Sequence, residues 1–346
     1  MSVYSSRLQQ LRQVMQQAGV DAYVVFSSDP HLSEYLPDYY QGRAWLSGFS
    51  GSAGSVVVTA DFAGVWADSR YWVQAEQDLQ DSGFALMRWG HPETPDMLDW
   101  VAQHLQEGQV IAYDGQVVAL AQARAWQAMA TQHQFVLDEN KDLLSLVWKD
   151  RPCLPTAPIY VHEAPFCQRS LSANLHAVQQ RIQALGASAH LISSLDDIAW
   201  LFNLRGSDVD YNPIFLAHAL IFSDQALLFV DEAKITEAVR AYLAQAPVTL
   251  MPYDQLALAL QALPSSMPVL IAPNAVTVGT LAAAPQVCWV EAPNPSTLLK
   301  ACKTPAEIQH VRDTMEADGA ALCQFFTWFE QTIQQRPITE LEVDEQ

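Results

Sequence analysis

Apolar residues recur with the same helix and strand spacings in two distant parts of the chain. Near the start, apolar positions three and four residues apart predict a helix that stops at Gly19, and residues 21–26 predict a short strand. Much later the same helical spacing stops at Gly186, and residues 188–192 predict the matching strand. The apolar positions of the two helices are Leu8, Leu11, Met15 and Ala18, and Leu171, Leu175, Val178, Ile182 and Leu185. The pattern therefore predicts a helix–strand unit that occurs twice.

The repeated pattern continues after these strands. The stretch WLSGFSGS at 45–52 matches WLFNLRGS at 200–207, and VVVTADFAGVWAD at 56–68 matches ALIFSDQALLFVD at 219–231. In both longer stretches two apolar strands flank a polar turn, and an aspartate closes the second strand. Alternation of strands and helices is typical of mixed sheets that helices cover. We therefore expect an α/β protein with two domains of one fold.

Proline marks the boundary between the two expected domains. Residues 151–165, RPCLPTAPIYVHEAP, contain four prolines, which interrupt regular structure. We therefore place a first domain at 1–155, a second at 156–297 and a third segment at 298–346.

Further elements fill out the expected domains. Thr94 and Pro95 predict the N-cap and the first position of a helix with an apolar stripe. Residues 109–112 and 269–272 are short apolar runs of the kind found in buried strands. Each domain thus has enough elements for a sheet with helices on its faces.

The third segment begins with a well-marked helix. Thr304, Pro305 and Glu307 have the spacing of a capping box with proline at the first helical position. One apolar face follows, formed by Ile308, Val311, Met315, Leu322, Phe326 and Phe329. Such a face stabilises a helix only when another element covers it. Because little chain follows, we expect the covering element to belong to a longer protein or to a partner.

The charge balance argues against two classes of partner. The chain has 346 residues, half of them hydrophobic, and a formal net charge of −20. Nucleic acids and anionic membrane surfaces bind basic faces, so we expect neither as a partner. The first residues lack the apolar core of a signal peptide, and no apolar run reaches the roughly 18 residues that span a membrane. Five scattered cysteines are typical of reduced thiols in a cytoplasmic protein.

The glycines of WLSGFSGSAGS at 45–55 do not fit a phosphate site. A P-loop requires a lysine after its last glycine, and a dinucleotide loop requires GxGxxG before a helix. Here glycine stands at every third position, no lysine follows, and the next residues predict a strand. We interpret the stretch as a tight connection in which glycine permits positive φ angles and close backbone packing.

Candidate chemistry is sparse. The sequence contains no HExxH motif, no clustered Cys/His pattern and no GxSxG elbow. In DSRYW, Arg70 can hold a carboxylate or carbonyl of a ligand, or pair with Asp68 as a structural contact. His31 and Glu34 follow the first strand, where they can belong to a site or cap a turn. The acidic stretch RGSDVD at 205–210 has the composition of a polar turn and too few ligands for a metal site.

Five stretches together resemble the three-domain cytoplasmic Xaa-Pro aminopeptidases, also called aminopeptidase P. They are DPHLSEYL (29–36), WLSGFSGSAGS (45–55), WADSRYWVQAEQ (66–77), LRGSDVDYNP (204–213) and LLKACKTPAEIQHVRDTMEADGAALCQFF (298–326). The resemblance runs in register over essentially the whole chain. It implies two tandem creatinase N-terminal-type domains, followed by the first helix of a catalytic domain of the pita-bread type.

The resemblance also implies an activity and a cofactor. The family releases the N-terminal residue of peptides that have proline at the second position. Two metal ions, usually manganese, activate a bridging hydroxide in the third domain, held there by two Asp, one His and two Glu. None of those motif segments occurs in this sequence. We therefore expect no catalytic residue, no metal-binding residue and no cofactor in this chain, which we expect to be inactive alone.

One site residue is implied by the resemblance. In the family, the arginine of a DGRY segment reaches toward the bound peptide, and its match here is Arg70 in DSRY. Ser69 replaces the usual glycine, which can alter the local turn but keeps the arginine. The resemblance further implies a cytoplasmic location and a parent enzyme that forms homodimers.

Two other interpretations remain open at this point. A non-catalytic relative is the main alternative, because creatinase-like domains also serve as peptide-binding or chaperone modules. A prolidase or creatinase is a further alternative, but these enzymes have one N-terminal domain, which disagrees with the internal duplication. The leading hypothesis is the N-terminal part of a dimanganese Xaa-Pro aminopeptidase.

Overall fold

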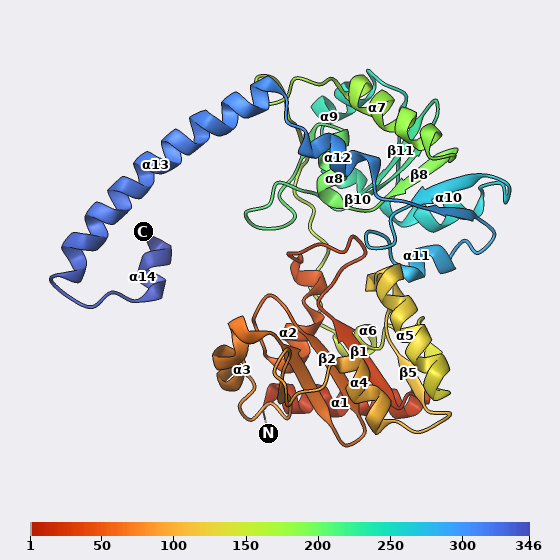
Figure 1. Cartoon of the computed structure of the whole chain (residues 1–346), viewed down its shortest axis with the longest axis vertical. Helices are drawn as coiled ribbons and strands as arrows, with labels where there is room; N and C mark the ends of the chain where they lie inside the picture. Colours follow the sequence, from red (N-terminus) through yellow and green to blue (C-terminus); the bar gives the residue numbers. More distant parts are fainter. Residues whose placement is uncertain (1) are drawn as a thin grey trace.

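The computed structural model describes residues 2–346, which form two α/β units and a long helix that leaves the second unit (Figure 1). Each unit is built around a six-stranded sheet that contains both parallel and antiparallel pairs. In Figure 1 the first unit is coloured red to yellow and lies below the second, which is coloured green to cyan. The predicted α/β fold with mixed sheets is confirmed.

The first unit has the strand order β4-β3-β2-β1-β5-β6. The pairs β1–β2 and β2–β3 are antiparallel, and the other pairs are parallel. The strands are β1 (Ala22–Phe26), β2 (Ser55–Thr59), β3 (Ala63–Ala67), β4 (Ala85–Arg88), β5 (Val110–Ala112) and β6 (Val136–Asp138). The helices are α1 (Val3–Ala18), α2 (Gly42–Ser47), α3 (Trp72–Asp78), α4 (Met97–His104), α5 (Leu120–His133) and α6 (Leu144–Val147).

Successive residues of β1 belong to different cores. Tyr23 and Val25 pack in the cluster that contains Leu11 of α1. Val24 packs in a second cluster with Trp126 of α5. Because a strand turns successive side chains to opposite faces, these clusters lie on the two sides of the sheet. The continuous apolar run of β1 follows from this two-sided burial.

The second unit repeats this architecture in the order β12-β11-β10-β8-β13-β14. The directions of equivalent strand pairs are also the same. The strands are β8 (Ala189–Ile192), β10 (Ala217–Phe222), β11 (Ala226–Val230), β12 (Val248–Met251), β13 (Pro268–Ile271) and β14 (Cys288–Glu291). The helices are α7 (Leu171–Ala184), α8 (Leu195–Leu201), α9 (Glu237–Leu243), α10 (Leu256–Gln261), α11 (Val278–Ala282) and α12 (Pro295–Ala301). A two-stranded ribbon joins β7 (Tyr160–Val161) and β9 (Leu204–Arg205).

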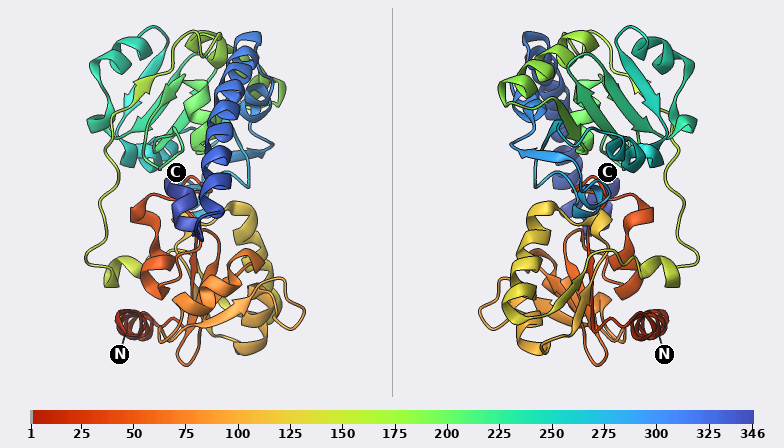
Figure 2. Two further views of the ribbon diagram at one scale, coloured as in Figure 1. Left: turned by 90° about the vertical axis from the view of Figure 1, so that its left-hand side faces the viewer. Right: turned by 90° about the vertical axis from the view of Figure 1, so that its right-hand side faces the viewer.

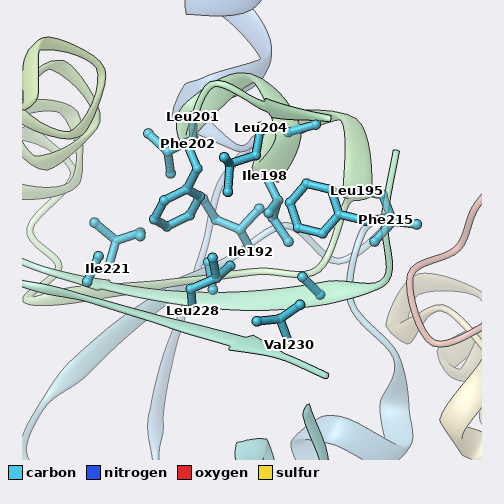
Figure 3. Packing of buried hydrophobic residues seen from close by; sticks show 14 of the residues in the cluster. Ile192, Leu195, Ile198, Leu201, Phe202, Leu204, Phe215, Ile221, Leu228 and Val230 are labelled. Carbon is cyan, nitrogen blue, oxygen red and sulfur yellow. The ribbon is translucent and has the colours of Figure 1, made fainter. Parts of the chain in front are cut away.

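Helix α8 and the residues around it cover one face of the second sheet. In Figure 3, Ile198 and Phe202 lie above Leu228 and Val230 of β11, and all four side chains are buried. Burial of an apolar side chain of this size contributes about 1.5–3 kcal/mol. This core therefore holds the segment between α8 and β10 firmly at both ends.

Several paired positions show the duplication in detail. Gly48 and Asn203, which occupy the same place in the matched WL stretches, both have positive φ angles, 84° and 50°. Asp68 and Asp231, which close β3 and β11, each cap a short 3₁₀ turn through a side-chain oxygen. The duplication predicted from the apolar pattern is therefore confirmed in both topology and local geometry.

The helix predicted to start at Thr94 begins later. Its first residue is Met97, and Asp96 is its N-cap. The Pro95 carbonyl oxygen instead accepts a hydrogen bond from the Trp66 indole nitrogen at 3.0 Å. The prediction of Thr94 as the cap was wrong because a tertiary contact holds residue 95 outside the helix.

Helix α13 (Pro305–Ile333) leaves the second unit and is followed by α14 (Glu340–Glu345). The predicted capping box is present, because the Thr304 hydroxyl accepts from the Glu307 amide and the Glu307 carboxylate accepts from the Thr304 amide. No residue of α13 is buried, and apolar side chains such as Val311 and Phe326 are about half exposed. Figure 2 shows the helix descending along one side of the molecule.

The two units are joined by main-chain hydrogen bonds as well as by the linker. The amides of Leu120 and Ala121 in α5 donate to carbonyl oxygens of Val276 and Pro273, at 2.9 and 3.1 Å. The Val278 amide in turn donates to a carbonyl of the first unit at 2.9 Å. Leu120 also packs in an apolar cluster of the second unit. These contacts fix the position of one unit relative to the other.

A buried polar cluster lies at the same junction. The imidazole of His31, from the loop after β1, makes hydrogen bonds to the Ser193 carbonyl oxygen at 2.9 Å and to the Tyr253 hydroxyl at 2.7 Å. Its ring lies against that of His218, with centroids 4.4 Å apart. Burial lowers the pKa of His31 to about 3 and that of His218 well below its ordinary value. Both rings are therefore neutral at pH 7.

This cluster is expected to make stability depend on pH. The unfolded chain protonates His31 below its ordinary pKa of 6.5, whereas the folded chain does not, so stability falls as the pH drops below 6.5. One such histidine contributes a slope of about 1.4 kcal/mol per pH unit. Urea unfolding between pH 7 and pH 5 is expected to show a smaller slope for His31→Gln than for the unmodified chain.

The slope of the variant is compared with that of the unmodified chain because a second buried group also affects the pH dependence. Burial raises the pKa of neighbouring Asp29, and this group makes the folded chain more stable as the pH falls. The exposed His176→Gln variant serves as the matched control. Equal slopes for His31→Gln and the unmodified chain would contradict this account of the junction.

Candidate functional site

A cleft of about 550 Å³ lies where the two units face each other. Its walls are formed by the loop after β1 (34–38), the glycine-rich connection (50–52), the proline-rich linker (152–155) and the turn before β10 (208–211). We call it the junction cleft. The fold thus brings together four stretches that the sequence singled out separately.

A larger hollow of about 1170 Å³ lies on the first unit beside α1 and the end of α4. It is lined by residues such as Arg12, Asp61 and His104, and by none of the residues considered above as candidate chemistry. The junction cleft is therefore the better candidate, because only there do several chemistry-bearing segments converge.

The glycine-rich connection is held by a buried arginine. Helix α2 ends at Gly48, and the Arg43 guanidinium donates to the carbonyl oxygens of Gly51 and Ala53. A Cβ atom at Gly51 would lie 2.4 Å from the Phe49 ring, so only glycine fits there without a shift. The carbonyls of the loop face a cation inside the protein, which agrees with the interpretation as a tight connection.

Arg70 lies on the 3₁₀ turn Ser69–Tyr71 that follows β3. Its Nε and Nη2 atoms donate to the two carboxylate oxygens of Asp68, at 3.0 and 2.8 Å. These hydrogen bonds lower the pKa of the Asp68 carboxyl. The predicted structural pair therefore exists, yet 67% of the Arg70 side chain is still exposed to solvent. The arginine is oriented by Asp68 and accessible to a ligand.

A hydroxyl contact connects this turn to the junction cleft. The Tyr71 hydroxyl lies 2.6 Å from the Ser52 Oγ atom, and Ser52 lines the cleft. Glu34, on the opposite loop, contributes to the electrostatic environment of Arg70. Arg70 does not itself line the cleft; it is placed at the rim because the adjacent Tyr71 contacts Ser52 of the glycine-rich wall.

The equivalent turn of the second unit has a different role. Ala233 stands at the position equivalent to Arg70, so this unit presents no arginine there. The next residue, Lys234, is buried and forms an ion pair with Asp208. The side chains of Lys234 and Asp208 are only 2% and 0% exposed. The duplicated turn therefore supports a wall of the cleft in this unit.

Asp208 organises the turn that forms that wall. Its Oδ2 atom also accepts a hydrogen bond from the Leu216 amide at 2.7 Å. A Cβ atom at Gly206 would lie 3.0 Å from the Ile214 carbonyl oxygen, so the two strands of the turn approach closely. The prediction of a polar turn was right. The partner Lys234 was missed because nothing in the local sequence distinguishes it from a surface lysine.

His31 and Glu34 separate in the structure. The His31 ring is buried in the junction between the units, while Glu34 lines the cleft. The expected capping role belongs to Asp29, whose Oδ1 atom accepts from the amides of His31 and Ser33 at 2.9 and 3.0 Å. His31 therefore positions one unit against the other.

The described residues contain neither a grouped set of metal ligands nor a membrane-spanning helix. Among residues 2–346, no group of three or more His, Cys, Asp and Glu side chains is arranged to hold a metal ion. No helix within the same residues combines the length and apolar character that a membrane crossing requires. The cleft therefore offers charged, hydroxyl and aromatic groups for binding, and it has no metal site of its own within this part of the chain.

This chain is similar to known proteins over nearly its whole length. Residues 7–151 and 150–307 each match the family described as Creatinase/Prolidase N-terminal domain. Aminopeptidase P2 of Arabidopsis thaliana is 32% identical over 99% of this chain. A probable Xaa-Pro aminopeptidase P of Coprinopsis cinerea is 34% identical over 95% of it. The matches cover 53% and 55% of those proteins, so the chain spans about half the length of the curated relatives it matches.

One solved structure agrees with the whole chain. It is a cytosolic X-prolyl aminopeptidase from Caenorhabditis elegans with a di-nuclear active site. The TM-score is 0.91 at 27% identity, and the match covers 99% of this chain and 58% of that one. The resemblance stated from the sequence and the two tandem creatinase N-terminal-type domains are thereby confirmed.

The buried Lys234–Asp208 pair is expected to be essential for stability. Lys234→Met leaves a buried carboxylate without its cation, and loss of one partner of a buried pair costs about 3–5 kcal/mol. The double variant Lys234→Met/Asp208→Asn removes the orphaned charge and is expected to recover much of the loss. Urea unfolding measures both free energies.

In the control Arg240→Ala, which breaks an exposed pair with Glu232, the expected loss is below about 1 kcal/mol. A Lys234→Met variant as stable as this control would contradict the account.

Proposed function

The chain belongs to the Creatinase/Prolidase N-terminal domain family, and from this premise we propose that it supplies the N-terminal domains of an Xaa-Pro aminopeptidase. Such an enzyme releases the first residue of peptides that have proline at the second position. The observation that carries the proposal is the similarity of nearly the entire chain to proteins with that name. The duplication supports it, because one fold occurs twice before α13.

We divide the chain into a first domain at 1–155, a second at 156–297 and the start of a catalytic, pita-bread type domain at 298–346. The side chains in residues 2–346 do not fit a two-metal site, so we place the metal ions, expected to be manganese, outside them. Bound metal ions of this kind would lower the pKa of a water and polarise the scissile carbonyl. The chain itself would contribute the walls that hold the peptide.

Arg70 is our candidate for contact with the peptide. It is largely exposed at the rim of the junction cleft, and Asp68 holds two of its nitrogens in a fixed orientation. A guanidinium oriented in this way can donate to a peptide carbonyl or carboxylate with little further loss of side-chain entropy. Its absence from the second unit, where Ala233 replaces it, agrees with a role beyond support of the fold.

Location and assembly follow from the same proposal. We place the protein in the cytoplasm, as expected from its scattered cysteines, all five of which are unpaired among the described residues. A net charge of −20 disfavours binding to nucleic acid or to an anionic membrane. We expect the complete enzyme to be a homodimer.

Metal dependence tests the proposal at the level of the domains. The 346-residue chain alone is expected to bind no Mn²⁺ stoichiometrically and to release no residue from Xaa-Pro peptides. The full-length enzyme is expected to hydrolyse them, to lose activity with a chelator and to regain it with Mn²⁺. Elemental analysis and a peptide-release assay measure these properties. Turnover by the chain alone would contradict the domain division, and an inactive full-length protein would favour a non-catalytic peptide-binding or chaperone module.

Substitution of Arg70 tests the proposed contact. In the full-length enzyme, Arg70→Ala is expected to lower kcat/KM for Xaa-Pro peptides by about 10–100-fold, the effect of losing one charge-assisted hydrogen bond. The Tm is expected to change little, because an exposed ion pair contributes only about 0–1 kcal/mol.

Arg88→Ala is the matched control, since Arg88 is an exposed arginine of the same unit that lies on β4, is paired with Glu76 and is not adjacent to a residue in contact with the cleft lining. Equal loss of activity in both variants, or unfolding of Arg70→Ala, would instead indicate a general or structural effect.

A further inference from the structure

The larger hollow of the first unit has a small counterpart in the second unit. We call the larger one, of about 1170 Å³ between α1, the β2–β3 turn and the end of α4, the α1 hollow. In Figure 1, α1 lies at the end of the first unit that is remote from the second unit. A hollow of about 170 Å³ lies at the equivalent place of the second unit, between α7 and the β10–β11 turn. The first-unit counterparts of all residues that line it also line the α1 hollow, and they are Arg12, Met15, Gln16, Val20, Asp21, Thr59 and Ala60.

One side chain in each hollow holds the adjacent turn. Arg12 Nε donates to the Thr59 carbonyl oxygen at 2.9 Å, and Gln179 Nε2 donates to the Phe222 carbonyl oxygen at 2.8 Å. Arg12 and Gln179 stand the same number of positions before the glycine that follows their helix. A glutamine is therefore enough for this structural contact. The arginine adds two nitrogens, Nη1 and Nη2, that donate to no described residue.

A tryptophan supplies a second free donor in the α1 hollow. Trp100 of α4 is only 6% exposed, and its ring stacks on those of Phe62 and His104, with centroids 4.4 and 4.0 Å apart. Its Nε1 atom is not sealed inside the protein, and it donates to no residue within 2–346. An indole N–H can only donate, and in a buried side chain it usually has a partner. The rigidly held donor at the hollow therefore points to a ligand with an acceptor.

An aspartate lies in the same hollow without a hydrogen bond to the arginine. The Oδ1 atom of Asp61 accepts from the Thr59 hydroxyl at 2.9 Å, and its Oδ2 atom accepts from no described residue. Burial lowers the pKa of the Arg12 guanidinium, and the charge of Asp61 acts in the opposite sense. The other acid of the hollow, Asp21, already accepts hydrogen bonds through both oxygens. The hollow thus contains a cation and an anion that each keep unused hydrogen-bonding atoms.

We propose that the α1 hollow binds a free apolar α-amino acid, whose carboxylate accepts from Arg12 and Trp100 and whose ammonium group donates to Asp61. A guanidinium presents paired donors that match a carboxylate. Met15 and Val20 line the hollow and offer apolar surface to the side chain of the amino acid. The two carboxylates of the hollow repel a dianion such as phosphate. This site is independent of the proposed aminopeptidase function, because it shares no lining residue with the junction cleft.

The test uses the 346-residue chain and three probes of similar shape. They are leucine, 4-methylpentanoate, which lacks the ammonium group, and 3-methylbutylamine, which lacks the carboxylate. Binding is followed through the proton–nitrogen NMR signal of the Trp100 indole, which is identified by its loss in Trp100→Phe. Leucine is expected to shift this signal in a saturable manner. Each analogue is expected to bind about tenfold more weakly than leucine, because it lacks one charge-assisted contact.

Substitutions assign each charged group of leucine to its partner. Arg12→Gln introduces the residue found in the second unit, so the contact with the turn and the Tm are expected to be kept. This variant is expected to bind leucine about tenfold more weakly and to leave the affinity for 3-methylbutylamine unchanged. Asp61→Asn is expected to weaken leucine and 3-methylbutylamine and to leave 4-methylpentanoate unchanged. Arg88→Gln is the matched control, because Arg88 is an exposed arginine of the same unit outside the hollow, and it is expected to bind all three probes normally.

Several results would overturn the proposal. The first is the absence of a saturable shift of the Trp100 signal with leucine. The second is leucine binding that Arg12→Gln leaves intact. Equal affinity for leucine and either analogue would show that one of the two charged contacts does not form. Tighter binding of inorganic phosphate than of leucine would indicate a simple anion site in place of an amino-acid site.

Discussion

The junction between the two units is the contact on which the proposed site depends. The walls of the cleft come from different units, so the cleft has a defined shape only if the units are held in one arrangement. Main-chain hydrogen bonds from Leu120 and Ala121 and the buried ring of His31 provide this restraint. Burial keeps the His31 imidazole neutral in the folded chain. The junction therefore contributes most to stability above pH 6.5, where the imidazole is neutral in the unfolded chain as well.

Duplication followed by divergence explains how a repeated fold builds an asymmetric cleft. Asp68 and Asp231 cap equivalent turns, so the backbone of the two units is the same at this point. The side chains that follow differ: Arg70 is exposed at the rim, whereas Lys234 is buried beneath the opposite wall. One unit therefore exposes its cation to solvent, while the other uses its cation to hold a turn whose exposed groups are acidic and aromatic.

Features that depend on neighbouring residues were predictable from the sequence. Gly19 and Gly186 end their helices with positive φ angles, and the Thr304 capping box is formed by residues three positions apart. The sequence also pointed to Arg70, although only the structure shows that it is oriented by Asp68 and still exposed. Contacts between distant residues were not predictable: Asp208 meets Lys234 26 positions away, and His31 meets Tyr253 222 positions away. No local pattern marks such partners, because tertiary packing alone brings them together.

The most direct test of the central claim is a structure of the full-length enzyme with an uncleaved Xaa-Pro peptide analogue. The measured quantity is the distance from the Arg70 guanidinium to the nearest oxygen of the bound peptide. The account predicts a hydrogen bond of about 3 Å, with the peptide lying against the junction cleft. A peptide bound away from the cleft, with Arg70 contacting only Asp68, would contradict the claim that these two units frame the substrate site.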